Sequence, residues 1–309
     1  MLLVANGSVF TRNAQTPFIP NGAVAIDGDT IVEVGPECEL KAKYPDAEYV
    51  DAQGNLIMPG LINCHTHIYS GLARDLAIKG CNPTNFLENL EQQWWKIDDN
   101  LTLAGTKASA YATILDSIRD GVTTIFDHHA SFCEIPGSLF TIKDAAQELG
   151  MRSCLCYEVS DRRGQEKCDQ AIAENAEFAQ WAAKERRDND NHMIAAMPNV
   201  GWCEAMTMLF ENNAKMASKY FDRKLGVLEP GAAADVIVMD YKPFTPLSEE
   251  NIDGHMLFGM MGKNCRTTII NGRVLYKDRE FVGIDEDKIN AWTMAESKKL
   301  WSTLNDRAY

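Results

Sequence analysis

The sequence predicts an α/β protein with two parts: a small composite β-sandwich built from both chain ends, and between them a barrel-like part of about four β/α units. Three observations support this prediction. Both ends of the 309-residue chain are rich in short strands and turns, the centre alternates strands with amphipathic helices, and 45% of the residues are apolar. A chain of this length and apolar content can bury a barrel core beside a smaller companion domain.

The first 55 residues have the pattern of a small β layer. Short apolar runs extend from Leu2 to Val4, from Ala23 to Ile26 and from Ile31 to Val34. The last two runs are separated by Asp27-Gly28-Asp29, a sequence that favours a tight reversal of the chain. We therefore expect residues 1–55 to form the N-terminal part of the sandwich.

From Asn55 onwards the pattern changes to strands that are each followed by a helix, which is typical of parallel β/α units. The predicted strands are Leu56 to His65, Val122 to Phe126, Met151 to Tyr157 and Met193 to Met197. The predicted helices are Thr84 to Ile97, Thr102 to Arg119, Lys143 to Leu149, Gln165 to Arg187 and Trp202 to Tyr220. We expect residues 56–224 to form the partial barrel.

After residue 224 the pattern returns to short strands. These are Val236 to Asp240, Thr267 to Ile270 and Val274 to Tyr276, and the dipeptide Asn271-Gly272 between the last two is a strong hairpin signal. Residues 225–285 are therefore expected to complete the sandwich, as one discontinuous domain with the first 55 residues. Residues 286–309 are expected to contain a terminal helix, Glu286 to Asn305.

Charge and cysteine content limit the class of function. Thirty basic against 44 acidic residues give a net charge of −14, which repels a phosphate backbone or an anionic membrane. We therefore expect neither nucleic acid nor membrane as a partner. Nine cysteines without CxxC spacing are typical of reduced thiols. Because the apolar run at the N-terminus is too short for a signal peptide, the expected location is cytoplasmic.

Two histidines at the end of the first central strand are candidate metal ligands. Side chains alternate along a strand, so His65 and His67 point to the same face and can hold one cation. Neutral imidazoles suit zinc and similar transition metals, which activate water near neutral pH. Taken alone, two histidines at this spacing are more often ordinary strand residues than metal ligands.

The segment around these histidines resembles a known family signature, and three further segments resemble the same family in the same order. The four segments are Pro59 to His67, Gly121 to Asp127, Gly226 to Asp240 and Thr267 to Val274. They are similar to the first barrel strand, the second barrel strand and two strand regions of the sandwich in the amidohydrolase superfamily. Within it, the chain most resembles the aminohydrolase and chlorohydrolase branch, and there the aminohydrolases linked to selenium metabolism.

This resemblance implies a TIM-type (β/α)₈ barrel with catalysis at the C-terminal ends of its strands. It further implies one divalent metal ion, zinc or alternatively iron, held by His65 and His67 together with histidines of the fifth and sixth strands and an aspartate of the eighth. The implied reaction is the hydrolysis of a C–N bond, by deamination or a related step, in a small molecule such as a cyclic amidine or amino-heterocycle.

The sequence departs from this pattern after Met197. There the chain continues directly into Pro198 to Trp202, which resembles the helix region before the sandwich. Because a β/α unit takes about 30 residues, four absent units correspond to a gap of about 120 residues. The predicted barrel is therefore incomplete and lacks its second half, and with it the later ligands. The remaining histidines include His192, interpreted as a surface residue, and His255, interpreted as structural.

A few other side chains are candidates for substrate binding. His128 and His129 follow the second strand on the face where a barrel has its site, although an ordinary loop role is also compatible. Trp94 lies on the helix after the first strand, where it contributes either to a substrate pocket or to apolar packing. Asp127 is interpreted as a helix cap or hydrogen-bonded turn residue. No residue is assigned as the catalytic acid or base.

Three readings of the incomplete site remain open. In the first, the chain is a hydrolase whose site is completed by a second subunit, as in a homo-oligomer, because catalytic zinc takes three protein ligands and water. In the second, it is a non-catalytic remnant that acts as a binding or oligomerisation module. In the third, an internal deletion between Met197 and Pro198 separates the chain from its family.

Overall fold

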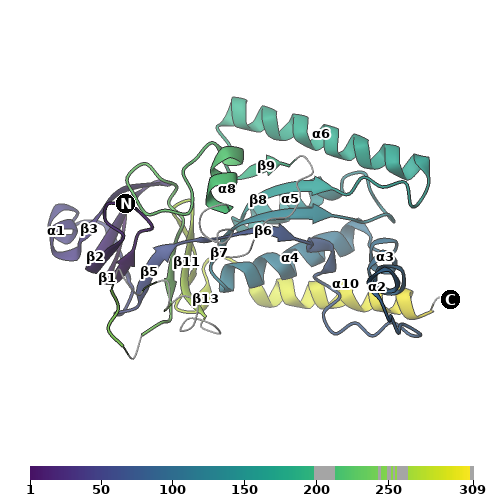
Figure 1. Cartoon of the computed structure of the whole chain (residues 1–309), viewed down its shortest axis with the longest axis horizontal. Coiled ribbons are helices and arrows are strands. Elements are labelled where there is room, and N and C mark those ends of the chain that lie inside the picture. The colour runs from purple at the N-terminus through teal and green to yellow at the C-terminus, as the bar shows by residue number, and fades with distance from the viewer. Residues whose placement is uncertain (198–212, 243–244, 249–251, 253–254, 256–263, 307–309) are drawn as a thin grey trace. The chain divides into compact units, whose positions relative to one another are not determined.

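The computed structural model describes residues 1–197, 213–242, 245–248, 252, 255 and 264–306 (Figure 1). The chain divides into two compact units. The first contains residues 1–63, 117–124 and 203–283, and the second contains residues 64–116, 125–202 and 284–309. Among the described residues, no helix is long and apolar enough to cross a membrane.

The first unit is built on a nine-stranded sheet to which both ends of the chain contribute. Its order is β13-β12-β11-β10-β5-β1-β2-β3, with β4 paired to β1. The strands are β1 (Leu2–Phe10), β2 (Phe18–Asp27), β3 (Thr30–Pro36), β4 (Glu48–Asp51), β5 (Leu56–Pro59), β10 (Val236–Met239), β11 (Cys265–Ile270), β12 (Arg273–Lys277) and β13 (Glu280–Phe281). The short strands predicted at the two ends are confirmed, and helix α1 (Glu37–Lys43), which was not predicted, follows β3.

The strands from the two ends of the chain share one apolar core. Val4 and Ile26 of the N-terminal strands pack in the same buried cluster as Val236 and Ile269 of the C-terminal strands. The predicted hairpin at Asn271-Gly272 connects β11 to β12, and both residues have positive φ, 50° and 76°. A Cβ at Gly272 would lie 1.7 Å from the carbonyl oxygen of Gly28, so the backbones approach as closely as only glycine allows.

The single strand predicted from Leu56 to His65 is two strands, and this prediction was wrong. It is broken at Gly60, with β5 before it and β6 (Leu61–Thr66) after it. Strand β5 pairs with β1 and with β10 in the nine-stranded sheet, whereas β6 pairs with β7. A Cβ at Gly60 would lie 2.2 Å from the hydroxyl oxygen of Thr123, so glycine is required where the chain changes sheets.

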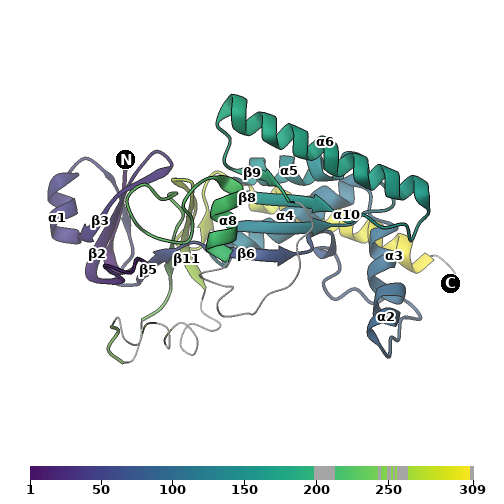
Figure 2. The ribbon, with the colours of Figure 1, turned by 45° about the horizontal axis from the view of Figure 1, so that its top comes forward.

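The second sheet has four strands in sequence order, β6-β7-β8-β9. The last three are β7 (Val122–His129), β8 (Arg152–Tyr157) and β9 (Ile194–Ala196), which confirms the predicted strands in outline. Strand β9 runs parallel to β8, and Figure 2 shows β6 and β8 running in one direction. Within the described part of the chain this sheet is open and forms no closed barrel.

Helices connect these strands. The predicted helix from Thr84 to Ile97 is a series of short turns: α2 (Phe86–Asn89), the π-helical turn η2 (Leu90–Trp94) and α3 (Trp95–Asp98). The longer helices are α4 (Leu103–Arg119), α5 (Ser138–Leu149) and α6 (Gln165–Asn189), and the last two pack against β8. Of the helix predicted from Trp202 to Tyr220, α8 (Asn213–Phe221) is present, and residues 202–212 lie outside the described residues.

The predicted terminal helix is α10 (Glu286–Asp306), which supports the segment after β6. Its Leu300 and Leu304 lie in one buried cluster with Leu72 and Leu101. The Trp301 indole nitrogen donates a hydrogen bond to the carbonyl oxygen of Leu72 at 2.8 Å. The end of the chain therefore helps to hold the segment that follows the two candidate metal ligands.

Candidate functional site

His65 and His67 lie at the C-terminal end of β6, as predicted from the sequence of the first central strand. Their ring centres are 4.8 Å apart and the two rings are nearly perpendicular, at 89°. His65 is exposed and His67 is half-buried. Two imidazoles on the same face of one strand end can therefore reach a common cation without a change in the backbone.

The tautomer of His67 follows from its hydrogen bond. Its Nδ1 lies 3.0 Å from the backbone carbonyl oxygen of His128. Because a carbonyl oxygen only accepts, Nδ1 carries the proton, and the lone pair of Nε2 remains for a metal ion. The pKa of His65 is lowered, first by its partial burial and second by the neighbouring His67. The lower pKa of His65 favours the neutral imidazole that metal binding requires, whereas the hydrogen bond of His67 only determines which of its ring nitrogens faces the backbone.

His128 lies beside His67 on the adjacent strand. The amide of Leu61 in β6 donates to the carbonyl oxygen of Gly121, which places Leu61 level with Val122 in a parallel pair. Continuing along both strands brings His67 level with His128, on the same face of the sheet. Their ring centres are 5.9 Å apart, and the His128 side chain is half-buried. The histidine face, defined as His65, His67 and His128, thus gathers three imidazoles.

Asp127 belongs to the opposite, buried face of β7. Its Oδ1 accepts a hydrogen bond from the amide of Ile68 at 2.6 Å, and its Oδ2 is buried without a hydrogen-bond partner among the described residues. Burial raises the pKa of Asp127 to about 8, partly offset by the hydrogen bond from Ile68. Asp127 therefore holds the turn directly after His67, in agreement with its interpretation as a hydrogen-bonded turn residue.

His129 is also fully buried. Its Nε2 lies 3.0 Å from the Ser131 hydroxyl, and its ring packs near those of Tyr69 and Tyr157, with centres 6.3 and 5.6 Å away. Burial, followed by the nearby His128, lowers the pKa of His129 to about 3, so the ring is neutral. The structure thus separates His128 and His129, which the sequence treated as equivalent candidates for substrate binding.

Trp94 lies near the site through an aromatic contact. Its ring centre is 6.4 Å from that of Tyr69. The ring centre of Tyr69 is in turn 5.5 Å from that of His67. Trp94 also packs against the buried cluster that contains Leu72 and Ile97. Trp94 therefore contributes to apolar packing, and its part in a substrate pocket stays a prediction.

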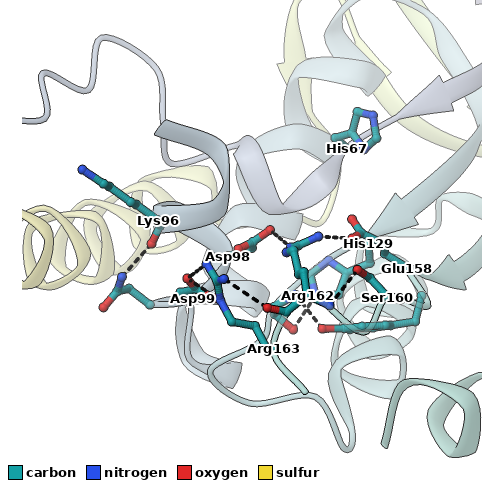
Figure 3. Close-up of polar contacts among 12 residues, drawn as sticks. His67, Lys96, Asp98, Asp99, His129, Glu158, Ser160, Arg162 and Arg163 are labelled. Carbon is teal, nitrogen blue, oxygen red and sulfur yellow. Dashed lines mark hydrogen bonds and ion pairs between the residues drawn. The ribbon is translucent and has the colours of Figure 1, made fainter. Parts of the chain in front are cut away.

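A buried ion-pair cluster, consisting of Asp98, Glu158 and Arg162, was not predicted from the sequence. The guanidinium of Arg162 donates to both carboxylates and lies over the Phe132 ring, 4.0 Å from its centre. Figure 3 shows Arg162 between Asp98 and Glu158, with His67 outside this network. Burial raises the pKa of Asp98 to about 8, although the attraction of Arg162 lowers it in part.

The remaining histidines lie elsewhere. His192 comes before β9 and its Nε2 is 2.8 Å from the Asp190 carboxylate. Its side chain is 15% exposed, so His192 is partly covered rather than fully exposed at the surface. His255 accepts or donates a hydrogen bond with the Tyr241 hydroxyl at 2.5 Å, in agreement with a structural role.

The two strand-end histidines fit a zinc or iron ion as part of its ligand set. Imidazoles are suitable donors for these ions, and the backbone contact at Nδ1 of His67 leaves its Nε2 for a metal ion. In the part of the chain that the structure describes, no three His, Cys, Asp or Glu side chains are already gathered closely enough to hold a metal ion. As placed, these residues therefore supply two ligands of the three that catalytic zinc requires.

Comparison with known sequences agrees with the resemblance noted above. Residues 56–220 match the amidohydrolase family, and residues 22–47 match an imidazolonepropionase-like composite domain of bacteria. A 5'-deoxyadenosine deaminase of Methanococcoides burtonii is 29% identical over 188 residues, 59% of this chain and 39% of the relative. A 5-methylthioadenosine/S-adenosylhomocysteine deaminase of Pelotomaculum thermopropionicum is 27% identical over 50% of this chain and 33% of the relative.

Solved structures show the same fold. The zinc complex of atrazine chlorohydrolase from Arthrobacter aurescens aligns with a TM-score of 0.65 at 17% identity, over 96% of this chain and all of that one. A zinc-bound adenosine deaminase from Xanthomonas campestris aligns with a TM-score of 0.66 at 13% identity, over 97% and 98% of the two chains. The family match covers more than half of the sequence, and the chain therefore belongs to the amidohydrolase family.

Proposed function

We propose that the protein is a metal-dependent amidohydrolase that removes an amino group from an amino-heterocycle of the adenosine type. The observation that carries the proposal is the pair His65 and His67 at a strand end, with the His67 Nδ1 proton held by the carbonyl oxygen of His128. The deaminases among its relatives support this reaction class. The matched segment spans 39% and 33% of those two relatives, so activity is proposed for this chain rather than transferred to it.

The residues at and around the two strand-end histidines each have a role in the proposed reaction. When bound, a divalent ion, zinc or alternatively iron, would supply the Lewis-acid chemistry that activates water near neutral pH. His65 and His67 would bind it, and Asp127 would hold the turn after His67 through the amide of Ile68. Tyr69 and Trp94 offer aromatic surface on which a planar heterocycle can pack. His128 and His129 remain the other candidates for contact with the substrate.

A second candidate function is a non-catalytic binding or oligomerisation module. It is favoured by the absence, among the described residues, of three gathered metal ligands. A homo-oligomer would be compatible with both candidate functions, because a second subunit can contribute a missing metal ligand. The selenium-linked branch and the cytoplasmic location stay predictions from the sequence. The named relatives act on adenosine-type compounds, and that substrate class is the one proposed here.

The first experiment is a measurement of zinc and iron per chain after purification and dialysis. Wild type is compared with the double variant His65→Ala/His67→Ala, and with His192→Ala as a control histidine distant in sequence from the site. We expect about one metal ion per chain in the wild type and the control, and none in the double variant. Wild-type protein that retains no metal after dialysis would overturn the proposal of a metal-dependent enzyme.

A second experiment tests the reaction. Metal-loaded wild type is incubated with adenosine, 5'-deoxyadenosine and 5-methylthioadenosine, and ammonia release is measured with and without a chelator. We expect release that the chelator and the double variant both abolish. A metal-loaded protein that releases no ammonia from any of them would favour the binding module over the deaminase.

A further inference from the structure

We propose that Ser109 and Asp127 are positioning residues for His67, the half-buried ligand of the proposed metal site. The inference rests on the proposed function, because it concerns how this ligand is held before a metal ion binds. Neither side chain is itself a ligand in the proposed site. Both act through the backbone of Ile68, the residue after His67, and neither the sequence pattern nor any of the comparisons assigns a role to Ser109.

The backbone directly after His67 is held at two consecutive peptide groups. In the first, the amide of Ile68 donates a hydrogen bond to Asp127 Oδ1 at 2.6 Å. The carbonyl oxygen of the same peptide group belongs to His67, and the Ser70 hydroxyl donates to it at 2.7 Å. In the second, the carbonyl oxygen of Ile68 accepts a hydrogen bond from the Ser109 hydroxyl. The peptide clamp therefore consists of Ser70, Ser109 and Asp127.

This clamp also fixes the direction of the His67 side chain. A peptide group is planar, so hydrogen bonds at its N–H and C=O leave only small rotations about the bonds of the adjoining Cα atom. The Cα–Cβ bond of His67 then keeps its direction, and Nδ1 of the ring lies 3.0 Å from the carbonyl oxygen of His128. A side chain that is already ordered loses less conformational entropy when it binds an ion.

The two positioning residues are built into the interior of the protein. Ser109, Asp127 and Ile68 are all fully buried. Ser109 reaches Ile68 because residue 71 is a glycine: a Cβ at Gly71 would lie 2.7 Å from the hydroxyl oxygens of Ser109 and Thr113 in α4. Burial of a hydroxyl or carboxyl group is unfavourable unless it is hydrogen-bonded, so both side chains are stabilised by the backbone of Ile68 and hold it in turn.

The test measures the tautomer of His67 in the folded, metal-free protein by nuclear magnetic resonance of the imidazole nitrogens. The chain has six histidines, and the signals that disappear in His67→Ala belong to His67. The pH is set well above the ordinary pKa of histidine, so that each ring carries one proton. A proton on Nδ1 reports the ring that contacts His128, because an imidazole in water carries its proton mainly on Nε2.

Four variants separate positioning from stability. Ser109→Ala removes the hydroxyl that holds Ile68, whereas the control Ser138→Ala removes a fully buried hydroxyl that has no hydrogen-bond partner among the described residues. Asp127→Leu removes the acceptor for the amide of Ile68, and Asp127→Asn keeps an oxygen there. Urea unfolding measures the stability of each variant, and competition with a chromophoric chelator gives its zinc dissociation constant. Ser109→Ala decides the matter if Asp127→Leu does not fold.

We expect His67 to carry its proton on Nδ1 in wild type, Ser138→Ala and Asp127→Asn. In Ser109→Ala and Asp127→Leu we expect a mixture of the two tautomers, and zinc binding that is weaker by about 10-fold, as when a residue that orients a ligand is lost.

Two outcomes would contradict different parts of this inference. A His67 tautomer that is unchanged in Ser109→Ala and Asp127→Leu would overturn the positioning role and leave the proposed function standing. So would a wild type in which His67 carries its proton on Nε2. A wild type that binds no zinc would overturn the proposed function, and the tautomers would still decide whether the two residues position His67.

Discussion

Two groups of polar side chains lie in the second unit, and they differ in how their polar atoms are paired. In the ion-pair cluster, Arg162 is bonded to two carboxylates and stacked on Phe132, and Asp98 is only 1% exposed. On the histidine face, His65 is exposed, and His67 uses one ring nitrogen for a backbone contact. In the first group the guanidinium is paired with both carboxylates, although Asp98 Oδ1 and Arg162 Nε are buried without a hydrogen-bond partner among the described residues. In the second group, Nε2 of His67 keeps its lone pair available.

The difference teaches which group supports the fold and which one can act on a ligand. A buried charge must be paired, and once it is paired it has little capacity left for a substrate. Neutral histidines at a strand end cost little to leave half-exposed, and they bind cations well. The cluster should therefore be needed for stability and the histidine face for metal binding, and the following predictions test that separation.

The largest expected effect comes from breaking the ion-pair cluster with Arg162→Ala. The substitution removes the guanidinium that pairs with Asp98 and Glu158, together with its contact with Phe132. Above about pH 8, where Asp98 is ionised, the buried Asp98 carboxylate is left unpaired, and we expect unfolding to become easier by about 3 kcal/mol. The matched control is Arg163→Ala, one residue later. Arg163 pairs with Asp99, but its side chain is 38% exposed, so the expected loss is below about 1 kcal/mol. Urea unfolding measures both, and equal losses would contradict the comparison.

A smaller effect is expected in the pH dependence of stability. Burial raises the pKa of Asp98 to about 8, so the folded chain holds this proton more tightly than the unfolded chain, where the pKa is close to 4. The stabilisation is therefore full below about pH 4 and is lost as the pH rises towards about 8. Asp98→Asn does not titrate, and its urea midpoint should fall less between pH 5 and 8 than that of wild type. Identical pH profiles would show that Asp98 is already ionised in the folded protein.

The sequence could predict the histidine face better than the ion-pair cluster. The pair His65 and His67 follows from the two-residue period of a strand, which is a local pattern. Asp98 and Arg162 are 64 residues apart, and only the fold brings them together. The neighbouring Arg163 and Asp99 have the same separation in sequence, so residue type alone could not distinguish the buried pair from the exposed one.

The strands were predicted more reliably than the points at which the chain changes direction. Four apolar runs became β6 to β9 because their alternation and length are written in consecutive residues. The break at Gly60 depends on the close approach of Thr123, a residue distant in sequence. Likewise, α5 begins at Ser138 rather than Lys143 because Glu174 of α6 accepts hydrogen bonds from the amides of Gly137 and Leu139.

The smallest expected effect is the change in stability of the metal-free protein caused by substitutions on the histidine face. His65→Ala removes an exposed side chain, and we expect the free energy of unfolding to change by less than about 0.5 kcal/mol. His67→Ala also removes the hydrogen bond to the carbonyl oxygen of His128, and should cost about 1 kcal/mol. Urea unfolding in the presence of a chelator measures both.

With zinc added, His65→Ala should no longer be nearly neutral while His67→Ala is the more destabilising of the two. Each histidine then contributes a metal ligand, and a ligand that binds only the folded chain stabilises it by mass action. Wild type should therefore gain stability with rising zinc concentration, while His65→Ala and His67→Ala gain much less, although His65→Ala alone is nearly neutral without metal. If His65→Ala gained as much stability from zinc as wild type, the exposed histidine would be an ordinary surface residue, and the contrast between the two groups would be lost.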